Sequence, residues 1–390
     1  MNTLNFQDFI KHPILLQSLH KAGYTTATAI QMELIPAIET GENILAIAPT
    51  GSGKTEAFVI PLLLAQLNNT DSSTKKVLIL SPTRELAIQT NQRIERLTEP
   101  LSVKSMAIYG GITYAQQQQE LANNPAFIVA TPGRLLDLHQ QGFIDLSEIE
   151  AVVVDEVDQM LELGFQQDIH QLLGLLATDA QRIFVSATLA PEIEKLAKKQ
   201  LKGMREIRIE EDKNLITEQL LFVDKNDKKD LIAYLLETFT LNQVLIFTRT
   251  THAVDRIVKN LETKNIVAKG LYADKSQASR EEIVRGFRAQ EYPVLVATDV
   301  ATRGIDIPNL PAIINYEIPD NTATYLHRIG RTGRRQAGTA FTFCDGEDNN
   351  KLIQLQIDLK KSIPVYDQHP YPLSWQKMQT SSNKPKKKRR

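Results

Sequence analysis

The stretch APTGSGKT at Ala48–Thr55 decides the fold prediction, because it has the composition of a phosphate-binding loop. It follows a short apolar run at Ile44–Ile47 and precedes an apolar stretch of helical length at Ala57–Leu67. A loop between a strand and a helix directs backbone N–H groups and the positive end of the helix dipole toward a polyphosphate. This order predicts a polyphosphate site at the loop.

The individual side chains of this loop suit phosphate and Mg²⁺. Gly51 and Gly53 let the backbone approach a phosphate closely, and Lys54 can reach the β- and γ-phosphates. The Thr55 hydroxyl suits a bound Mg²⁺. Ala48 stands where the pattern G-x-x-x-x-G-K-[ST] has its first glycine, so the match is incomplete.

A second string, AVVVDEVD at Ala151–Asp158, supplies the acids that such a site needs. Its first four residues form a continuous apolar run, which is typical of a buried parallel strand. Asp155 and Glu156 follow at the carboxyl end, where ligands bind in open α/β sheets. We expect Asp155 to hold Mg²⁺ through water and Glu156 to activate the attacking water. The two strings together predict a nucleoside-triphosphate hydrolase.

Length and composition agree with a globular protein of two or three domains. The chain has 390 residues, of which 42% are hydrophobic and 23% are charged. No apolar run approaches the roughly 18 residues of a membrane span, and the N-terminus lacks the pattern of a signal peptide. The single cysteine, Cys344, excludes an intramolecular disulfide and is expected to be an inert core thiol. We therefore expect an intracellular protein without a membrane partner.

Charge is unevenly distributed along the chain. Lys384–Arg390 carries six basic residues and no acidic one, and the rest of the chain has 39 basic and 46 acidic residues, a net charge of −7. A nucleic-acid site on the body must therefore be a local patch. The final PKKKRR has two readings that stay open, a nuclear import signal or a tail that grips RNA phosphates.

Apolar runs alternate with helical patterns in two successive halves. The first half has predicted strands at Val77–Leu80, Phe127–Ala130, Ala151–Val154 and Ile183–Val185, and helical spacing at Leu86–Leu97 and Leu161–Leu173. The second has predicted strands at Val244–Phe247, Val294–Ala297 and Ile313–Asn315, and helical spacing at Ala253–Leu261 and Ser279–Phe287. Such alternation predicts an α/β fold with parallel sheets flanked by helices.

Only the first half contains a G-K-[ST] string. We therefore expect nucleotide to bind in a cleft between the two halves, as is common at domain interfaces. The predicted divisions are an N-terminal domain at residues 1–209, a linker at 210–215, a C-terminal domain at 216–362 and a polar tail at 363–390.

Further strings appear in a fixed order along the chain. They are PTRELA at Pro82–Ala87, the pair Gly110 and Gly111, TPGR at Thr131–Arg134, SAT at Ser186–Thr188, ATDVATRGID at Ala297–Asp306 and YLHRIGRTGR at Tyr325–Arg334. With the loop and DEVD, they closely resemble the DEAD-box family of ATP-dependent RNA helicases over about residues 6 to 345. The resemblance implies two tandem RecA-like domains that close over ATP and single-stranded RNA.

By this resemblance, nucleotide contacts fall on both halves. Phe6 is expected to stack on adenine and Gln31 to bind the base edge, while Asp306 is placed for the ribose. Arg331 and Arg334 resemble arginine fingers, and Lys54, Asp155 and Glu156 complete the catalytic set. The whole set expected to bind ATP and Mg²⁺ through the first half is Phe6, Gln31, Thr50, Gly51, Ser52, Gly53, Lys54, Thr55 and Glu56, with the metal on Thr55 and Asp155.

The same resemblance implies an RNA track that contacts the sugar-phosphate backbone without reading sequence. Its expected residues are Arg84, Gly111, Thr131, Arg134, Arg249, Arg280, Thr298 and Gly304. Arg84 and Arg134 have a second reading, as surface arginines at helix N-termini. Asp158, Ser186, Thr188 and His327 are expected to couple the active site to domain closure.

Two departures from the family pattern affect the expectations. Ala27 and Ala29 replace the prolines of the adenine motif PTPIQ, which loosens that loop in the free state and weakens the expected base selectivity. Tyr272-Ala273 stands where the family commonly has His-Gly, and nothing in the sequence explains that change.

The leading hypothesis is a monomeric RNA-dependent ATPase that unwinds short duplexes in the cytoplasm of a bacterial-type cell, with a nuclear location as the alternative. An ATP-controlled RNA clamp and a DNA translocase are the competing functions.

Overall fold

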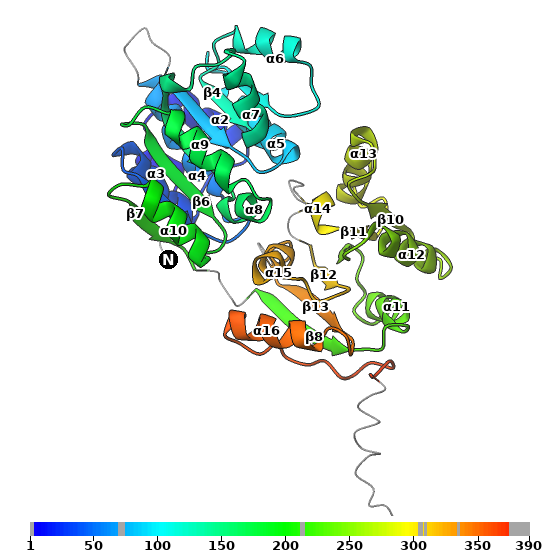
Figure 1. Cartoon of the computed structure of the whole chain (residues 1–390). Helices are drawn as coiled ribbons and strands as arrows, with labels where there is room; N and C mark the ends of the chain where they lie inside the picture. The colour runs from blue at the N-terminus through cyan, green and yellow to red at the C-terminus, as the bar shows by residue number, and fades with distance from the viewer. Residues whose placement is uncertain are drawn as a thin grey trace, which may run out of the picture. The chain divides into compact units, whose positions relative to one another are not determined.

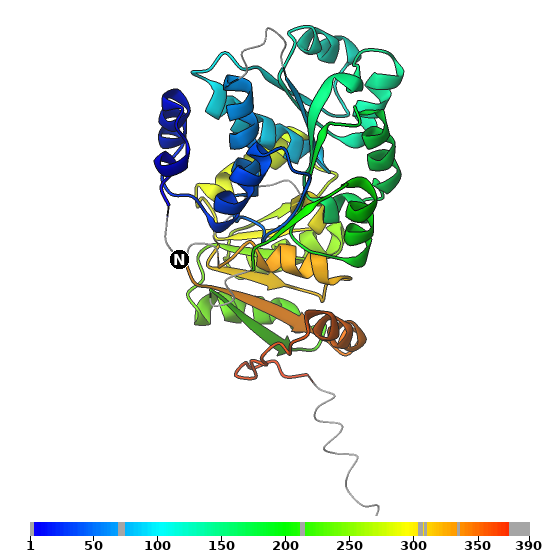
Figure 2. The same ribbon diagram turned by 90° about the vertical axis from the view of Figure 1, so that its left-hand side faces the viewer.

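The computed structural model describes residues 4–68, 75–210, 215–302, 307, 310–333 and 336–373. The chain divides into two compact units, Met1–Glu211 and Asp212–Arg390. Figures 1 and 2 show that each unit is built from a sheet with helices against it. The predicted linker falls almost entirely outside the described residues, as does most of the predicted tail, including Lys384–Arg390.

Unit 1 is built on a seven-stranded sheet in the order β3-β4-β2-β5-β6-β1-β7, in which every neighbouring pair is parallel. Its strands are β1 (Ile44–Ile47), β2 (Lys76–Leu80), β3 (Ser105–Ile108), β4 (Phe127–Ala130), β5 (Ile149–Val154), β6 (Gln181–Ser186) and β7 (Arg205–Arg208). The strands β5, β6 and β1 are consecutive neighbours, so the loops after them meet at one edge of the sheet.

Both faces of this sheet are buried, which explains the continuous apolar runs in the sequence. Val77 and Ile79 point into one core cluster, while Leu78 and Leu80 point into the other. The first cluster includes residues from α2 (Pro13–Lys21), α3 (Ala29–Glu39), α4 (Lys54–Leu67) and α5 (Arg84–Thr98); the second includes residues from α7 (Pro132–Gln140), α8 (Val157–Glu162), α9 (Gln166–Leu175) and α10 (Pro191–Gln200). Short helices α1 (Phe6–Phe9) and α6 (Tyr114–Leu121) complete the unit with the 3₁₀ turn Leu146–Glu148.

Unit 2 repeats the plan with a six-stranded parallel sheet in the order β10-β11-β9-β12-β13-β8. Its strands are β8 (Ile216–Phe222), β9 (Val244–Phe247), β10 (Ala268–Leu271), β11 (Val294–Ala297), β12 (Ala312–Asn315) and β13 (Gly338–Cys344). Its helices are α11 (Lys228–Thr238), α12 (Thr251–Glu262), α13 (Gln277–Arg288), α14 (Asp299–Thr302), α15 (Thr322–Ile329) and α16 (Asn349–Leu359). α11 and α12 pack in one core cluster, and α13, α15 and α16 pack in the other.

The predicted α/β class with two tandem parallel-sheet units is confirmed, and one predicted helix is wrong. The spacing over Leu161–Leu173 suggested one helix, but α8 ends at Glu162 and α9 begins at Gln166. Gly164 lies between them with a φ of +84°, a backbone conformation that ends a helix and suits glycine. No helix within the described part of the chain is long and apolar enough to cross a membrane.

Candidate nucleotide and RNA sites

The phosphate loop joins β1 to α4, and its backbone requires glycine. Gly51 and Gly53 have φ angles of +80° and +91°, and Gly53 is the residue that caps α4. A Cβ on Gly53 would lie 2.5 Å from Nε2 of Gln31, so a side chain there would also displace the Gln31 amide. The loop therefore brings the N-terminus of α4 and the adenine motif together.

Two polar side chains of the loop are withdrawn from solvent. The Lys54 ammonium donates to the carbonyl oxygens of Ala48 at 2.7 Å and Pro49 at 3.2 Å, and the residue is 8% exposed. The Ser52 hydroxyl oxygen is buried and has no hydrogen-bond partner. A buried polar atom without a partner is unfavourable by about 1–3 kcal/mol, so such an atom fits a site that a ligand completes.

Asp155 and Glu156 stand at the carboxyl end of β5. Glu156 caps α8 in the left-handed region, with φ 50° and ψ 53°, which is uncommon for a residue other than glycine. Its Oε2 atom is buried without a hydrogen-bond partner. Burial, together with the neighbouring Glu156 charge, raises the pKa of Asp155 to about 7, and the Lys54 ammonium opposes this shift. The two carboxyl groups are therefore crowded, and a cation would relieve that crowding.

The residues at these strand ends fit a nucleotide that carries its own metal. No cluster of three or more His, Cys, Asp or Glu side chains suited to a metal occurs among the described residues. Mg²⁺ is commonly bound by one or two carboxylates together with substrate phosphates. Asp155 and Thr55 would be the protein's contribution to such a site, and the unpartnered atoms of Ser52 and Glu156 lie on the same two loops.

Asp158, the last residue of the DEVD string, connects that segment to the loop after β6 through hydrogen bonds. Its Oδ2 atom accepts from the Ala187 and Thr188 backbone N–H groups, both at 3.0 Å, and from the Thr188 hydroxyl at 3.1 Å. The Ser186 hydroxyl accepts from the Thr188 N–H at 3.3 Å. The DEVD and SAT strings are thus joined within unit 1, while their role in closure stays a prediction.

The expected adenine-binding residues Gln31 and Phe6 make hydrogen bonds or packing contacts within unit 1. The Gln31 amide accepts from the Thr28 N–H at 2.9 Å and donates to the Gly53 carbonyl at 3.1 Å. Phe6 is 2% exposed and packs in the core of unit 1, so its ring has no open face for a base in this structure. Its stacking on adenine stays a prediction.

Glu56 is also engaged by neighbours within unit 1. It is 3% exposed and accepts from the Tyr24 hydroxyl at 2.7 Å and from Arg93 at 3.3 Å. These contacts indicate that the Glu56 carboxylate braces α4, and its contact with nucleotide stays a prediction.

Arg84 and Gly111 lie together on unit 1. Arg84 begins α5, and its guanidinium carbon lies 4.8 Å from the centre of the Tyr109 ring. A Cβ on Gly111 would be 3.2 Å from the Arg84 guanidinium, so glycine keeps this approach open. Thr131 caps α7 and follows β4, the neighbour of β3. Three of the predicted RNA contacts therefore follow the carboxyl ends of β2, β3 and β4, which are consecutive strands of the sheet.

Arg134 lies in the first turn of α7 and makes contacts on several sides of its guanidinium, while its contact with RNA stays a prediction. Its guanidinium donates to Gln117 Oε1 at 2.7 Å and to the Ile112 carbonyl at 2.7 Å, and it lies 3.9 Å from the centre of the Tyr114 ring. An ion pair with Asp137 at 3.3 Å completes the set, and the side chain is 12% exposed. Arg134 therefore fastens α7 to α6 and to the loop that carries Gly111.

Unit 2 places its predicted RNA contacts at neighbouring strand ends. Arg249 follows β9 and pairs with Asp348 at 2.8 Å, and Thr298 follows the adjacent strand β11. Arg280 on α13 donates to the Ala301 carbonyl at 3.2 Å, close to Thr298 along the chain. Gly304, Asp306 and Arg334 lie outside the described residues.

Arg328 was not singled out from the sequence, although it is buried and makes several polar contacts near the predicted fingers. It is 2% exposed and donates to both Asp299 carboxylate oxygens at 2.6 Å. Its other nitrogen donates to Asn315 Oδ1 at 3.1 Å. The available signal was helical spacing, since Tyr325, Arg328 and Ile329 share the buried face of α15. The pair joins the start of α14 to the helix that precedes Arg331, and His327 lies on the same helix.

Two tandem parallel-sheet units, one of which carries a phosphate loop after β1 and an acid pair after β5, on either side of β6, define the class of RecA-like nucleoside-triphosphate hydrolases. A DEAD/DEAH box helicase model matches residues 28–196, and a helicase conserved C-terminal domain model matches residues 227–336. The DEAD-box ATP-dependent RNA helicase RhpA of Helicobacter pylori is 35% identical over 367 residues, covering 93% of this chain and 74% of RhpA. CshA of Bacillus subtilis is 33% identical over 365 residues, with coverages of 93% and 74%.

Solved structures agree with this relationship. The DEAD box protein from Methanococcus jannaschii matches with a TM-score of 0.61 and 33% identity, covering 94% of this chain and 100% of that one. Dbp5 of S. cerevisiae bound to RNA and ADP BeF3 matches with a TM-score of 0.80 and 27% identity, with coverages of 97% and 98%. The chain belongs to the DEAD-box family of ATP-dependent RNA helicases.

Proposed function

We propose that this helicase is an RNA-dependent ATPase whose two units close over ATP and single-stranded RNA, and that it thereby separates short duplexes or remodels ribonucleoprotein. The observation that carries the proposal is the pair of buried atoms without partners, Ser52 Oγ and Glu156 Oε2, on the loops after β1 and β5. The RNA- and ADP BeF3-bound state of the similar Dbp5 supports the same pairing of ligands.

In unit 1, Lys54 neutralises phosphate charge and the N-terminus of α4 supplies N–H donors. Mg²⁺, held by Thr55 and Asp155, would supply charge neutralisation at the phosphates when bound. Glu156 takes the proton of the attacking water, a task suited to a carboxylate held at a fixed turn. The neighbouring loop residues Thr50, Gly51 and Gly53 form the backbone that surrounds the phosphates.

In unit 2, Arg331 and Arg334 act as arginine fingers that stabilise charge in the transition state. The Arg328–Asp299 pair supports this role, because it fixes α15 against the start of α14. Asp306 is assigned to the ribose. His327, with the Asp158–Thr188 link in unit 1, is assigned to coupling between hydrolysis and closure.

The RNA track is assigned to strand ends and the helices that follow them on both units. Arg84, Gly111, Thr131 and Arg134 serve unit 1, and Arg134 also braces the loop that carries Gly111. Arg249, Arg280, Thr298 and Gly304 serve unit 2. Hydroxyls, glycines and arginines suit a sugar-phosphate backbone, so the track positions a strand without reading its bases.

The variant Glu156→Gln tests the proposal. It keeps the shape of the side chain and removes the base, so we expect hydrolysis to fall by roughly 10²–10⁴-fold. RNA should remain tightly bound as long as ATP and Mg²⁺ are present. Glu150→Gln is the matched control, because Glu150 is an exposed acid on the same strand. Failure of Glu156→Gln to retain RNA in ATP would contradict the closed state.

Unwinding is distinguished from clamping by the fate of the bound RNA once ATP has been hydrolysed. The proposal predicts that the wild-type protein then releases RNA rapidly and separates a short RNA duplex in multiple rounds. Persistent RNA binding after hydrolysis, without strand separation, would favour the clamp instead.

A further inference from the structure

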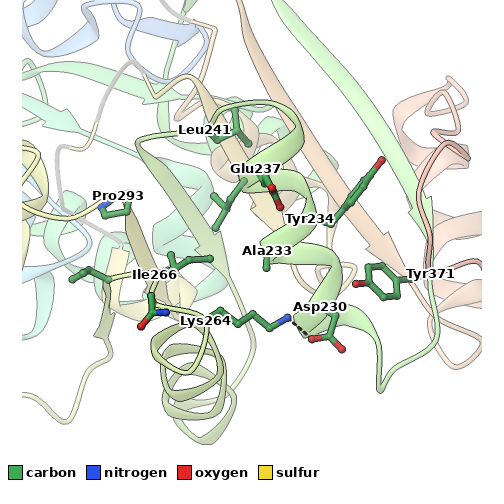
Figure 3. A pocket seen from close by; sticks show the side chains of 12 residues that line it. Asp230, Ala233, Tyr234, Glu237, Leu241, Lys264, Ile266, Pro293 and Tyr371 are labelled. Carbon is green, nitrogen blue, oxygen red and sulfur yellow. Dashed lines mark hydrogen bonds and ion pairs between the residues drawn. The ribbon is translucent and has the colours of Figure 1, made fainter.

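Unit 2 carries a groove of about 720 Å³ that has no part in the proposed active site. It lies between α11 and the loop that joins α12 to β10 (Figure 3). Leu236, Leu241, Ile266 and Val267 contribute apolar surface, and Val267 is 55% exposed. A groove that gathers several apolar side chains offers a surface on which another apolar group can be buried.

The C-terminal segment leads directly to this groove. Tyr366 donates its backbone N–H to the Leu220 carbonyl of β8 at 2.8 Å, and Val365 forms a parallel bridge with Leu220. The chain then crosses α11, where the Tyr234 hydroxyl donates to the Gln368 carbonyl at 3.0 Å. Tyr371 lines the groove (Figure 3), and Leu373, the last described residue, is 1% exposed.

We propose that the groove is the docking site for the residues that come after Leu373, with Trp375 as the anchor. Trp375 is four residues beyond Tyr371, so an extended chain carries it no farther than roughly 13–14 Å from a residue that already lines the groove. An indole combines a large apolar area with one N–H donor, which suits an apolar site with polar groups at its edge.

Charge complementarity supports the same occupant. Asp230 and Glu237 stand at the rim, and the Asp230 carboxylate is paired with the Lys264 ammonium (Figure 3). Since that pair is neutral as a whole, the exposed Glu237 leaves the rim with a net negative charge. The segment to be docked carries Lys377 two residues after Trp375 and no acidic residue from Ser374 to its end. Docking would fix the point from which the basic cluster Lys384–Arg390 leaves unit 2.

Trp375 is the single tryptophan of the chain, so tryptophan fluorescence of the full-length protein reports on this residue alone. The proposal predicts blue-shifted emission and weak acrylamide quenching in the wild type. Val267→Asp should shift the emission to the red and raise the quenching constant several-fold, and Glu237→Lys should act in the same direction to a smaller extent. Both side chains are exposed, so the variants should fold, which circular dichroism and unchanged ATP turnover would verify.

Ile357→Asp is the matched control, because Ile357 is 62% exposed on α16 of the same unit and does not line the groove. Its fluorescence should equal that of the wild type. Solvent-exposed Trp375 in the wild type, or shielding that survives both groove variants, would overturn the proposal. Shielding that disappears on dilution would assign the groove to a second copy of the chain, and shielding that appears only with RNA would assign Trp375 to base stacking.

Discussion

Each of the two units has its own parallel sheet flanked by helices, but the polar side chains that follow the strands have different partners in the two units. Unit 1 leaves Ser52 Oγ and Glu156 Oε2 buried without partners after β1 and β5. In unit 2, Arg328 is bound to Asp299, and the fully buried Lys228 pairs with Asp345 at 2.8 Å. Both units also contain other buried atoms without partners, such as Asn91 Oδ1 in unit 1 and Gln219 Oε1 in unit 2, so the contrast concerns only the named groups. Those of unit 1 can be completed by a ligand, whereas the named charges of unit 2 brace its own loops.

This difference is explained by the energetics of buried polar groups. Orphaned atoms destabilise the free protein and gain their partners when ligand arrives. A buried ion pair adds little net stability but is costly to break, so it fixes geometry. We infer that unit 1 is built to gain energy from ATP and that unit 2 is built to hold its arginines in place.

The largest expected effect comes from removing a finger of unit 2. Arg331→Ala should lower ATP turnover at saturating RNA by roughly 10³–10⁵-fold, because an arginine finger stabilises charge only in the transition state. ATP binding to unit 1 should survive, as measured by equilibrium titration with a fluorescent ATP analogue. Arg285→Ala, an exposed arginine on α13, is the control. Near-normal turnover in Arg331→Ala would remove unit 2 from the chemistry.

The next largest expected effect is the loss of stability when the Arg328–Asp299 ion pair is broken. Asp299→Ala leaves the Arg328 guanidinium, which is 2% exposed, without its carboxylate, and breaking a buried pair destabilises by about 3–5 kcal/mol. The comparison is Glu99→Ala in unit 1, which removes the exposed Lys21–Glu99 pair and should change stability much less, because solvent screens an exposed pair. Urea unfolding of the two variants measures both values. Equal, small losses would mean that the Arg328 pair does not brace unit 2.

A smaller effect is expected on the choice between ATP and GTP. Gln31 connects the adenine motif to the phosphate loop through Gly53, so we expect ATP to be used more efficiently than GTP. The preference should be less sharp than is usual for the family, because Ala27 and Ala29 replace the prolines that stiffen the motif. Values of kcat/KM for the two nucleotides decide this, and equal values would refute a working adenine motif.

The smallest effect is expected from the basic cluster at the end of the chain. Deleting Lys384–Arg390 should leave ATP turnover at saturating RNA unchanged and raise the RNA concentration needed for half-maximal stimulation. The logarithmic salt dependence should flatten by about 0.7 for each RNA phosphate that the cluster neutralises in the full-length protein. An unchanged salt slope would favour the import-signal interpretation of PKKKRR.

The sequence was most informative where apolar runs are buried on both faces and where glycines are required. β1, β4, β9 and β11 have the predicted bounds, because short continuous apolar runs in an alternating α/β pattern are typical of strands buried on both faces. The phosphate loop and the acid pair were recognisable from residue types and order.

Side-chain partners could not be predicted in the same way. Arg134, Arg328 and Lys228 look like surface residues in a sequence, yet their burial depends on acids and carbonyls far along the chain, such as Asp299 for Arg328. The burial of Phe6 likewise depends on how α1 packs against the rest of unit 1. Such contacts are set by tertiary packing, which periodicity does not encode.

We propose that the ATP site is split between the two units and is completed only when RNA binds. This proposal is tested most directly by measuring ATP turnover of the wild-type protein at saturating ATP and Mg²⁺, without nucleic acid, with single-stranded RNA, and with DNA of the same sequence. We expect slow ATP turnover without nucleic acid, stimulation of severalfold or more by RNA, and much weaker stimulation by DNA. Turnover that is equally fast without nucleic acid, or equally stimulated by DNA, would contradict it.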